Sequence, residues 1–182
     1  MDDWRNEGNN LSSSRGTAAA LVVAAGILGA AQTAVAEESG SFTAVASMIH
    51  DYTTIEHARG TIIGGASEGI STVLESSGGP FVVGGHSHVT CVVYGKRSAA
   101  GMGLEAPCTS TVASGDKLYS LSKRSAGDVE EGGGGKGGLE LLGGTGKYGG
   151  VTGTCTYETD YLTTDRYVTM TYCMWRRSAE RK

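Results

Sequence analysis

Residues Gly143–Tyr157 read G-G-T-G-K-Y-G-G-V-T-G-T-C-T-Y, a glycine-rich turn that leads directly into an alternating segment. Six of the residues from 143 to 153 are glycines. Glycine reaches positive φ without a steric cost and lets backbones approach closely, so it marks bends and bulges between strands. Tyr148 and Val151 are the apolar anchors among them. The stretch therefore predicts a sharp bend in a coiled sheet, followed by a strand.

The same stretch contains a formal G-x-G-x-x-G pattern at Gly144, Gly146 and Gly149. Dinucleotide-binding folds need a helix directly after this pattern. The residues that follow, T-G-T-C-T-Y, are poor helix material. A P-loop is disfavoured as well, because Tyr148 stands where Ser or Thr is required. We therefore expect a structural turn and no cofactor.

The rest of the chain consists of short apolar and β-branched runs separated by turn residues. The spacing is typical of an all-β sandwich or barrel, and thirty glycines with only two prolines suit a tightly curved sheet. The expected strands are 41–50, 53–63, 69–74, 80–83, 88–94, 109–112, 117–122, 139–142, 151–161 and 166–175.

The sequence Gly143-Gly-Thr-Gly-Lys-Tyr148, followed by Gly150-Val-Thr-Gly153, resembles the late signature of allene oxide cyclase and dirigent barrels. It also resembles small exported bacterial proteins that have this predicted barrel and no assigned activity. The resemblance covers roughly residues 91–175. It implies a single antiparallel eight-stranded barrel of the calycin or allene oxide cyclase-like type, with a lumen, and a homo-oligomer. The motif is structural, so no catalytic residue is carried over.

Residues 1–36 have the order of a secretory signal peptide. An uncharged run rich in alanine, valine and leucine covers 17–31, and Ala34-Val35-Ala36 offers an A-x-A cleavage pattern. A retained anchor is the alternative, because the chain starts with acidic residues, but the run is short for a membrane span. We expect an exported protein, periplasmic or secreted, with its domain at 37–182 and no membrane span after processing.

Charge and low-complexity segments restrict the partners further. The formal net charge of −4 and the lack of a basic cluster in the domain argue against nucleic acid. Residues 128–138 (D-V-E-E-G-G-G-G-K-G-G) are of low complexity and are expected to form a mobile loop. A glycine-rich phosphate cradle is the alternative, and it is disfavoured because the acidic side chains would repel a phosphate. Residues 176–182 are expected to be a solvated basic tail.

The even number of cysteines in an exported chain predicts disulfides. In an antiparallel hairpin, the numbers of paired residues have a constant sum. Pairing Cys155 with Cys173 centres the turn on Thr164, in a polar break between two runs, and pairing Cys91 with Cys108 centres it beside Ala99. These two pairs are therefore predicted. A metal or redox thiol pair is the alternative, disfavoured because no C-x-x-C occurs.

His86-Ser-His88 is the sharpest candidate for metal chemistry. Residues i and i+2 of a strand face the same side, so both imidazoles could hold one metal ion. Two ligands do not make a site, and a third would have to come from His50, His57 or a distant carboxylate. We expect solvated or hydrogen-bonded histidines and no metal. Both residues remain candidates for ligand binding.

Glu140, Tyr148 and Tyr157 are the other ligand-binding candidates. Glu140 lies between two leucines, so it faces either the lumen, where burial would raise its pKa and suit acid–base chemistry, or solvent, which is favoured. Tyrosines outnumber phenylalanines eight to two and crowd the last third. They either line a pocket or form cross-strand pairs on a wet sheet face, and the second arrangement is slightly favoured.

Two hypotheses of function follow. The first is a non-catalytic barrel that binds a small apolar ligand in its lumen or acts as an envelope or extracellular interaction module. The alternative is a lumen-based cyclase or isomerase. No paired carboxylates stand out as an acid–base pair, so the sequence favours the first. A filled lumen would leave only the interaction module.

Overall fold

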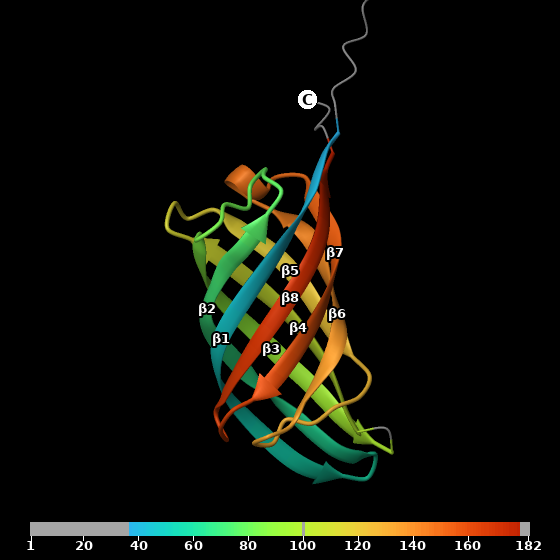
Figure 1. The fold of residues 1–182 in the computed structure, drawn as a ribbon. Coiled ribbons are helices and arrows are strands. Elements are labelled where there is room, and N and C mark those ends of the chain that lie inside the picture. Colours follow the sequence, from blue (N-terminus) through green and yellow to red (C-terminus); the bar gives the residue numbers. More distant parts are fainter. Residues whose placement is uncertain (1–36, 100, 179–182) are drawn as a thin grey trace, which may run out of the picture. The chain divides into compact units, whose positions relative to one another are not determined.

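The computed structural model describes residues 37–99 and 101–178, which form one closed antiparallel barrel with strand order β1 to β8 (Figure 1). The predicted fold class is confirmed. Each strand pairs with the next along the chain, and β1 pairs with β8, so no strand edge stays open. The strands are β1 (Glu38–His57), β2 (Gly60–Ser76), β3 (His86–Ser98), β4 (Gly101–Val112), β5 (Lys117–Arg124), β6 (Gly134–Gly144), β7 (Val151–Tyr161) and β8 (Arg166–Arg177).

The predicted strand boundaries were wrong in the first third of the barrel. The expected strand 53–63 is split by a turn at Ala58–Arg59, and the Gly64-Gly65 pair, read as a break, lies within β2. Glycines are needed inside β2 because it approaches β1 closely. A Cβ at Gly69 would meet the backbone oxygen of Ser47. In a tightly curved sheet such glycines mark close approach of strands, not chain reversal.

The expected strand at 80–83 is a loop. Residues 77–85 connect β2 to β3 and cover one end of the barrel, where Phe81 is 4% exposed. Proline cannot donate to a β-ladder, and Gly79 and Gly84 adopt positive φ, so a regular strand cannot form here. Figure 1 shows this loop beside the short helix η1 (Gly146–Tyr148), and Phe81 lies 5.6 Å from Tyr148. We call this the capped end.

The stretch at 143–157 folds as predicted, with a bend followed by a strand. β6 ends at Gly144, η1 makes a single turn, and β7 begins at Val151, which is fully buried. Gly146 has φ 53°, and a Cβ there would meet the carboxylate of Asp116. Tyr148 is buried under the loop that carries Phe81. The two predicted apolar anchors thus close the capped end.

The predicted low-complexity loop is shorter than 128–138. Residues 134–138 belong to β6 and pair with β7, because Gly137 leaves room for the ring of Tyr157. The remaining loop is held by Asp128, whose carboxylate accepts hydrogen bonds from the amides of Val129 (2.7 Å) and Glu130 (3.3 Å) and pairs with Arg97 at 3.5 Å.

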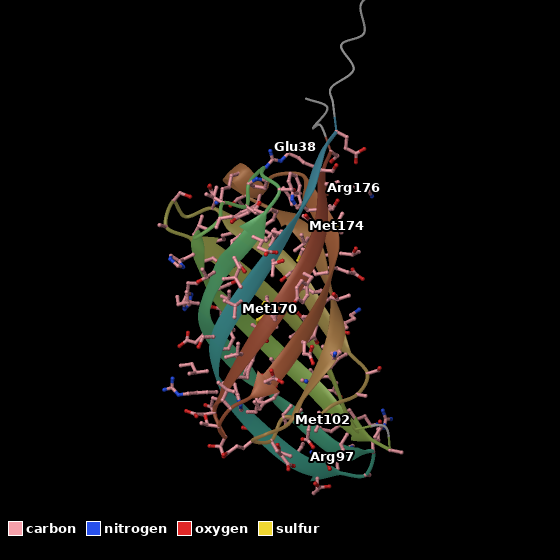
Figure 2. All side chains as sticks on the ribbon, in the orientation of Figure 1. Glu38, Arg97, Met102, Met170, Met174 and Arg176 are labelled. Atoms are coloured by element: carbon pink, nitrogen blue, oxygen red, sulfur yellow. A yellow bond between two sulfur atoms is a disulfide. The ribbon has the colours of Figure 1, made fainter. Side chains whose placement is uncertain are left out.

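The basic tail also begins later than predicted. Arg176 and Arg177 belong to β8, and Arg177 pairs with Glu38 at 2.7 Å. Figure 2 shows Glu38 and Arg176 near each other, at the opposite end from Arg97 and Met102. We call that opposite end, which carries the β1–β2, β3–β4 and β7–β8 turns, the hairpin end. The predicted signal peptide (1–36) and residues 179–182 lie outside the described residues.

Both predicted disulfides are present. Cys91–Cys108 joins directly opposed residues of β3 and β4, and Cys155–Cys173 does the same for β7 and β8. Two disulfides are typical of proteins that fold in an oxidising, extracellular or exported environment. No helix within the described residues is long and apolar enough to cross a membrane.

Candidate functional site in the barrel lumen

The lumen of the barrel is partly open near the capped end. A cavity of about 150 Å³, which we call the capped-end cavity, lies among inward-facing residues of the strands and the residues that cover that end. Its lining is mostly apolar, with hydroxyl groups from serines and threonines between the apolar side chains. The apolar members include Phe42, Ala44, Ala46, Met48, Val73, Phe81, Val89, Leu118, Leu139 and Leu141.

A second cavity, of about 80 Å³, lies nearer the hairpin end. This hairpin-end cavity is lined by one cation, Arg124, and by four tyrosines, together with smaller side chains. The two cavities are adjacent, because six residues line both of them: Cys91, Cys108, Ser122, Leu139, Tyr167 and Thr169. The two cavities therefore form one lumen, whose charged lining lies towards the hairpin end.

Arg124, the last residue of β5, is the only charged side chain lining either cavity, and it is 7% exposed. Its Nη2 donates a hydrogen bond to the backbone oxygen of Asp128 (2.7 Å), whereas its buried Nε has no partner among the described residues. The guanidinium carbon lies 5.8 Å from the centre of the Tyr161 ring. Glycines at 127 and 135 make room for it, since a Cβ at either would lie 3.0–3.3 Å from guanidinium atoms.

The four tyrosines of the hairpin-end cavity are Tyr52, Tyr157, Tyr161 and Tyr167. Tyr161 and Tyr167 face each other across β7 and β8, with ring centres 5.1 Å apart, and the Tyr167 hydroxyl donates to Ser67 Oγ (2.8 Å). Burial raises the pKa of Tyr161 to about 12, although nearby Arg124 opposes the shift, and burial also raises the pKa of Tyr52. The hydroxyls of Tyr52 and Tyr161 are therefore protonated at neutral pH.

His50 of β1 extends this polar cluster. Its ring stacks on Tyr52 at 4.0 Å and meets Tyr161 edge-on at 5.5 Å. Both ring nitrogens are buried and have no hydrogen-bond partner among the described residues. Burial lowers the pKa of His50, more than Asp165 and Asp51 raise it. The imidazole is therefore neutral at pH 7, with one nitrogen able to accept a proton.

The structure brings only two of the predicted ligand-binding residues into the lumen. Tyr148 lines the capped-end cavity and Tyr157 the hairpin-end cavity. Glu140, His86 and His88 are exposed on the outer face of the barrel, so they do not contribute to a lumen site. The favoured solvent position of Glu140 agrees with this placement. The slight preference for tyrosines on a wet face was wrong for Tyr148, Tyr157 and Tyr161, which are buried, whereas Tyr172 is exposed.

The two histidines that suggested a metal make ordinary surface contacts. Nδ1 of His86 lies 2.9 Å from the hydroxyl of Thr72, and Nε2 of His88 lies 3.8 Å from a carboxylate oxygen of Glu68. Within residues 37–99 and 101–178, no group of three or more histidine, cysteine or acidic side chains could hold a metal ion.

Arg124 is the residue that sequence reasoning missed. The expected strand ended at residue 122, whereas β5 continues to Arg124. The signal was the alternation itself. If Leu118 faces the core, then Ser120, Ser122 and Arg124 face it too, and all four line the lumen. Arg124 occupies the fourth inward position of β5, where its charge suggested that the strand had already ended. In the structure it is a buried cation.

No family model and no curated protein matches the chain. The solved structures that are similar to it include two described as pterocarpan synthase dirigent proteins. GePTS1 is 16% identical over 80% of this chain and 89% of its own, with a TM-score of 0.47. PsPTS1 is 16% identical over 80% of this chain and 97% of its own, with a TM-score of 0.43. At this identity the likeness concerns the fold alone. The resemblance to allene oxide cyclase stays a prediction.

Proposed function

We propose that this protein is an exported barrel that binds one small, largely apolar molecule in its lumen without transforming it. The capped-end cavity carries this proposal. Its volume of about 150 Å³ and its lining of phenylalanine, leucine, valine, alanine and methionine suit a compact molecule of about one ring. Apolar cavities of this size stay dry and take up single-ring hydrocarbons in other proteins. Larger ligands are disfavoured, because drug-sized sites begin near about 300 Å³.

Export is supported by two independent features. The disulfides Cys91–Cys108 and Cys155–Cys173 are typical of oxidising compartments. The apolar run and the A-x-A pattern of residues 1–36 are those of a signal peptide. Native mass spectrometry of protein from the exported fraction tests both points together with occupancy. We expect the mass of residues 37–182, less four hydrogens, with one added small molecule. An unprocessed chain with free thiols would contradict export.

Binding in the lumen is tested with toluene and two matched variants. Ala46→Leu adds apolar volume in the capped-end cavity, whereas Ala66→Leu makes the same change on the exposed outer face of β2. Toluene should bind the wild-type protein and Ala66→Leu equally, with Ala46→Leu at least about tenfold weaker, because a filled cavity excludes the ring. Binding that does not respond to Ala46→Leu, or that is absent from the wild-type protein, would contradict the lumen as the site.

A lumen-based isomerase is the second candidate, and the cluster that His50 forms with tyrosines of the hairpin-end cavity favours it. The neutral imidazole of His50 stacks on Tyr52, and Tyr161 and Arg124 lie in the same cluster. This set combines a proton acceptor with neutral donors and one cation, which acid–base chemistry in a lumen would need. The two functions differ in what leaves the protein. A binding protein releases its ligand unchanged, whereas an isomerase releases a product whose proton spectrum differs from that of the molecule supplied.

A further inference from the structure

We propose that the hairpin-end cavity holds the carboxylate of a compact organic acid, with Arg124 as the binding cation and the apolar body of the acid directed towards the capped-end cavity. The inference rests on the proposed lumen binding and names the chemical class of the ligand.

The charge balance of the lumen is the first argument. Arg124 is 7% exposed, and its side chain remains protonated in proteins. None of the ion pairs within the described residues includes it, and the nearby carboxylate of Asp128 pairs with Arg97 instead. Buried charges in proteins are normally paired, because an isolated one loses its hydration without compensation. A bound anion supplies the missing charge.

The available hydrogen-bond donors are the second argument. A guanidinium has five N–H donors, and Arg124 uses Nη2 for one hydrogen bond to a backbone oxygen. The buried Nε, which has no partner among the described residues, is one of the unused donors. Tyr157 and Tyr161 line the same cavity and bring hydroxyl donors. Arginine with neutral hydroxyls is the donor set that recognises a planar carboxylate.

Size and charge number select a carboxylate among anions. One cation balances one negative charge, so a phosphate dianion would leave a charge unpaired in a buried site. The hairpin-end cavity, at about 80 Å³, accommodates a small head group, whereas the adjoining cavity of about 150 Å³ is apolar. The six residues that line both cavities place the head group next to space for a ring. A monocarboxylic acid with a single-ring body fits both halves of the lumen.

Three probes of nearly equal shape test this assignment by isothermal titration calorimetry: toluene, benzamide and benzoate. Benzoate carries the charge, and benzamide is its neutral isostere. At pH 7 we expect benzoate to bind about tenfold or more tightly than benzamide, as expected for a hydrogen-bonded charge pair. Equal affinities for benzoate and benzamide, with toluene bound, would overturn this inference and leave lumen binding intact. Binding of none of the three would overturn both.

Two substitutions locate the preference. Arg124→Met removes the charge but keeps much of the length and the apolar stem of the side chain. The ratio of the affinity for benzoate to the affinity for benzamide should therefore fall to about one, while toluene binding remains. Lys123→Met removes the neighbouring cation of β5, which lies on the outer face near Glu105, and should leave the ratio unchanged. If Arg124→Met fails to fold, Arg124→Lys, which keeps the charge, replaces it. Its ratio should fall at least about threefold, because an ammonium lacks the fork. An unchanged ratio in the folded Arg124 variant would overturn the assignment.

Discussion

Phe81, in the loop between β2 and β3, stacks on Phe42 of β1 with ring centres 3.8 Å apart and planes 17° apart. The same ring lies 5.7 Å from Trp175 of β8. A loop residue therefore joins two strands at the capped end and forms part of the wall of the capped-end cavity. This contact is an apolar anchor of a segment that lies outside the strands, so we expect the stability of the cap to depend on it.

Phe81→Ala should lower the free energy of unfolding by about 3 kcal/mol, because a buried ring is lost from a packed cluster. It should also speed ligand exchange, since the ring lies between the capped-end cavity and solvent. Denaturant unfolding measures the first effect and stopped-flow fluorescence the second. Val82→Ala is the matched control, because Val82 is 63% exposed and should cost little. Equal, small losses for both variants would show that Phe81 does not anchor the cap.

Removing either disulfide should destabilise the barrel by about 3 kcal/mol, the value expected for hairpin loops of 17 and 18 residues. The double variant Cys155→Ala/Cys173→Ala tests one bridge and Cys91→Ala/Cys108→Ala the other. Urea unfolding of the oxidised protein gives the reference. The bridges act mainly by restricting the unfolded chain. Reductant should therefore lower the urea midpoint of the wild-type protein, and it should leave the urea midpoint of a variant lacking all four cysteines unchanged. If the urea midpoint of the wild-type protein is the same with and without reductant, the disulfides do not stabilise the barrel.

The parts of this fold that could be predicted from sequence are those that depend on local rules. The Cys155–Cys173 register followed from hairpin symmetry, and the bend before Val151 followed from glycine. Long-range closure could not be read in the same way. A pair of glycines between two β-branched runs suggests a chain reversal. Here Gly64 and Gly65 instead lie within β2, where the sheet of the barrel is tightly curved. Local composition does not contain that curvature.

The lumen site shows the same division. Alternation places Arg124 on the same face of its strand as Leu118, and Tyr157 on the same face as Cys155, and this much was readable from residue numbers alone. That Arg124 meets Tyr161 depends on how β5 and β7 come together across the lumen, which no local pattern encodes. The exposed histidines illustrate the converse, because His86 and His88 share a face but that face is outside. Inside and outside become fixed only when the sheet closes.

Gly146 tests the turn at the start of η1. Gly146→Ala should lower the free energy of unfolding by about 2 kcal/mol or more, because φ is 53° and the new Cβ would meet the carboxylate of Asp116. Gly115→Ala is the matched control. Its φ is also positive, at 87°, but nothing lies within 4 Å of the new Cβ. The difference between the two variants in thermal unfolding isolates the contact with Asp116, and equal losses would mean that backbone strain alone matters.

His50 should make the barrel less stable in mild acid. Burial lowers the pKa of His50 in the folded state, and in the unfolded chain the group titrates near about 6.5. Between these two values the unfolded state binds more protons than the folded state, so the free energy of unfolding falls as pH decreases through about 6.5. Above that pH the imidazole is neutral in both states and its contribution is constant. The expected signature is a fall in the urea midpoint between pH 7 and pH 5.

His50→Phe separates this effect from other titrations. Phenylalanine keeps a ring against Tyr52, which His50 contacts at 4.0 Å, and it does not titrate. The variant should therefore show a shallower fall in the urea midpoint between pH 7 and pH 5 than the wild-type protein. His57→Phe, at the exposed tip of the β1–β2 hairpin, serves as the control for adding an apolar ring. Parallel pH profiles for the wild-type protein and His50→Phe would show that the imidazole is protonated in the folded barrel as readily as in the unfolded chain. Burial would then not lower the pKa of His50, and the loss of stability in mild acid would have another source.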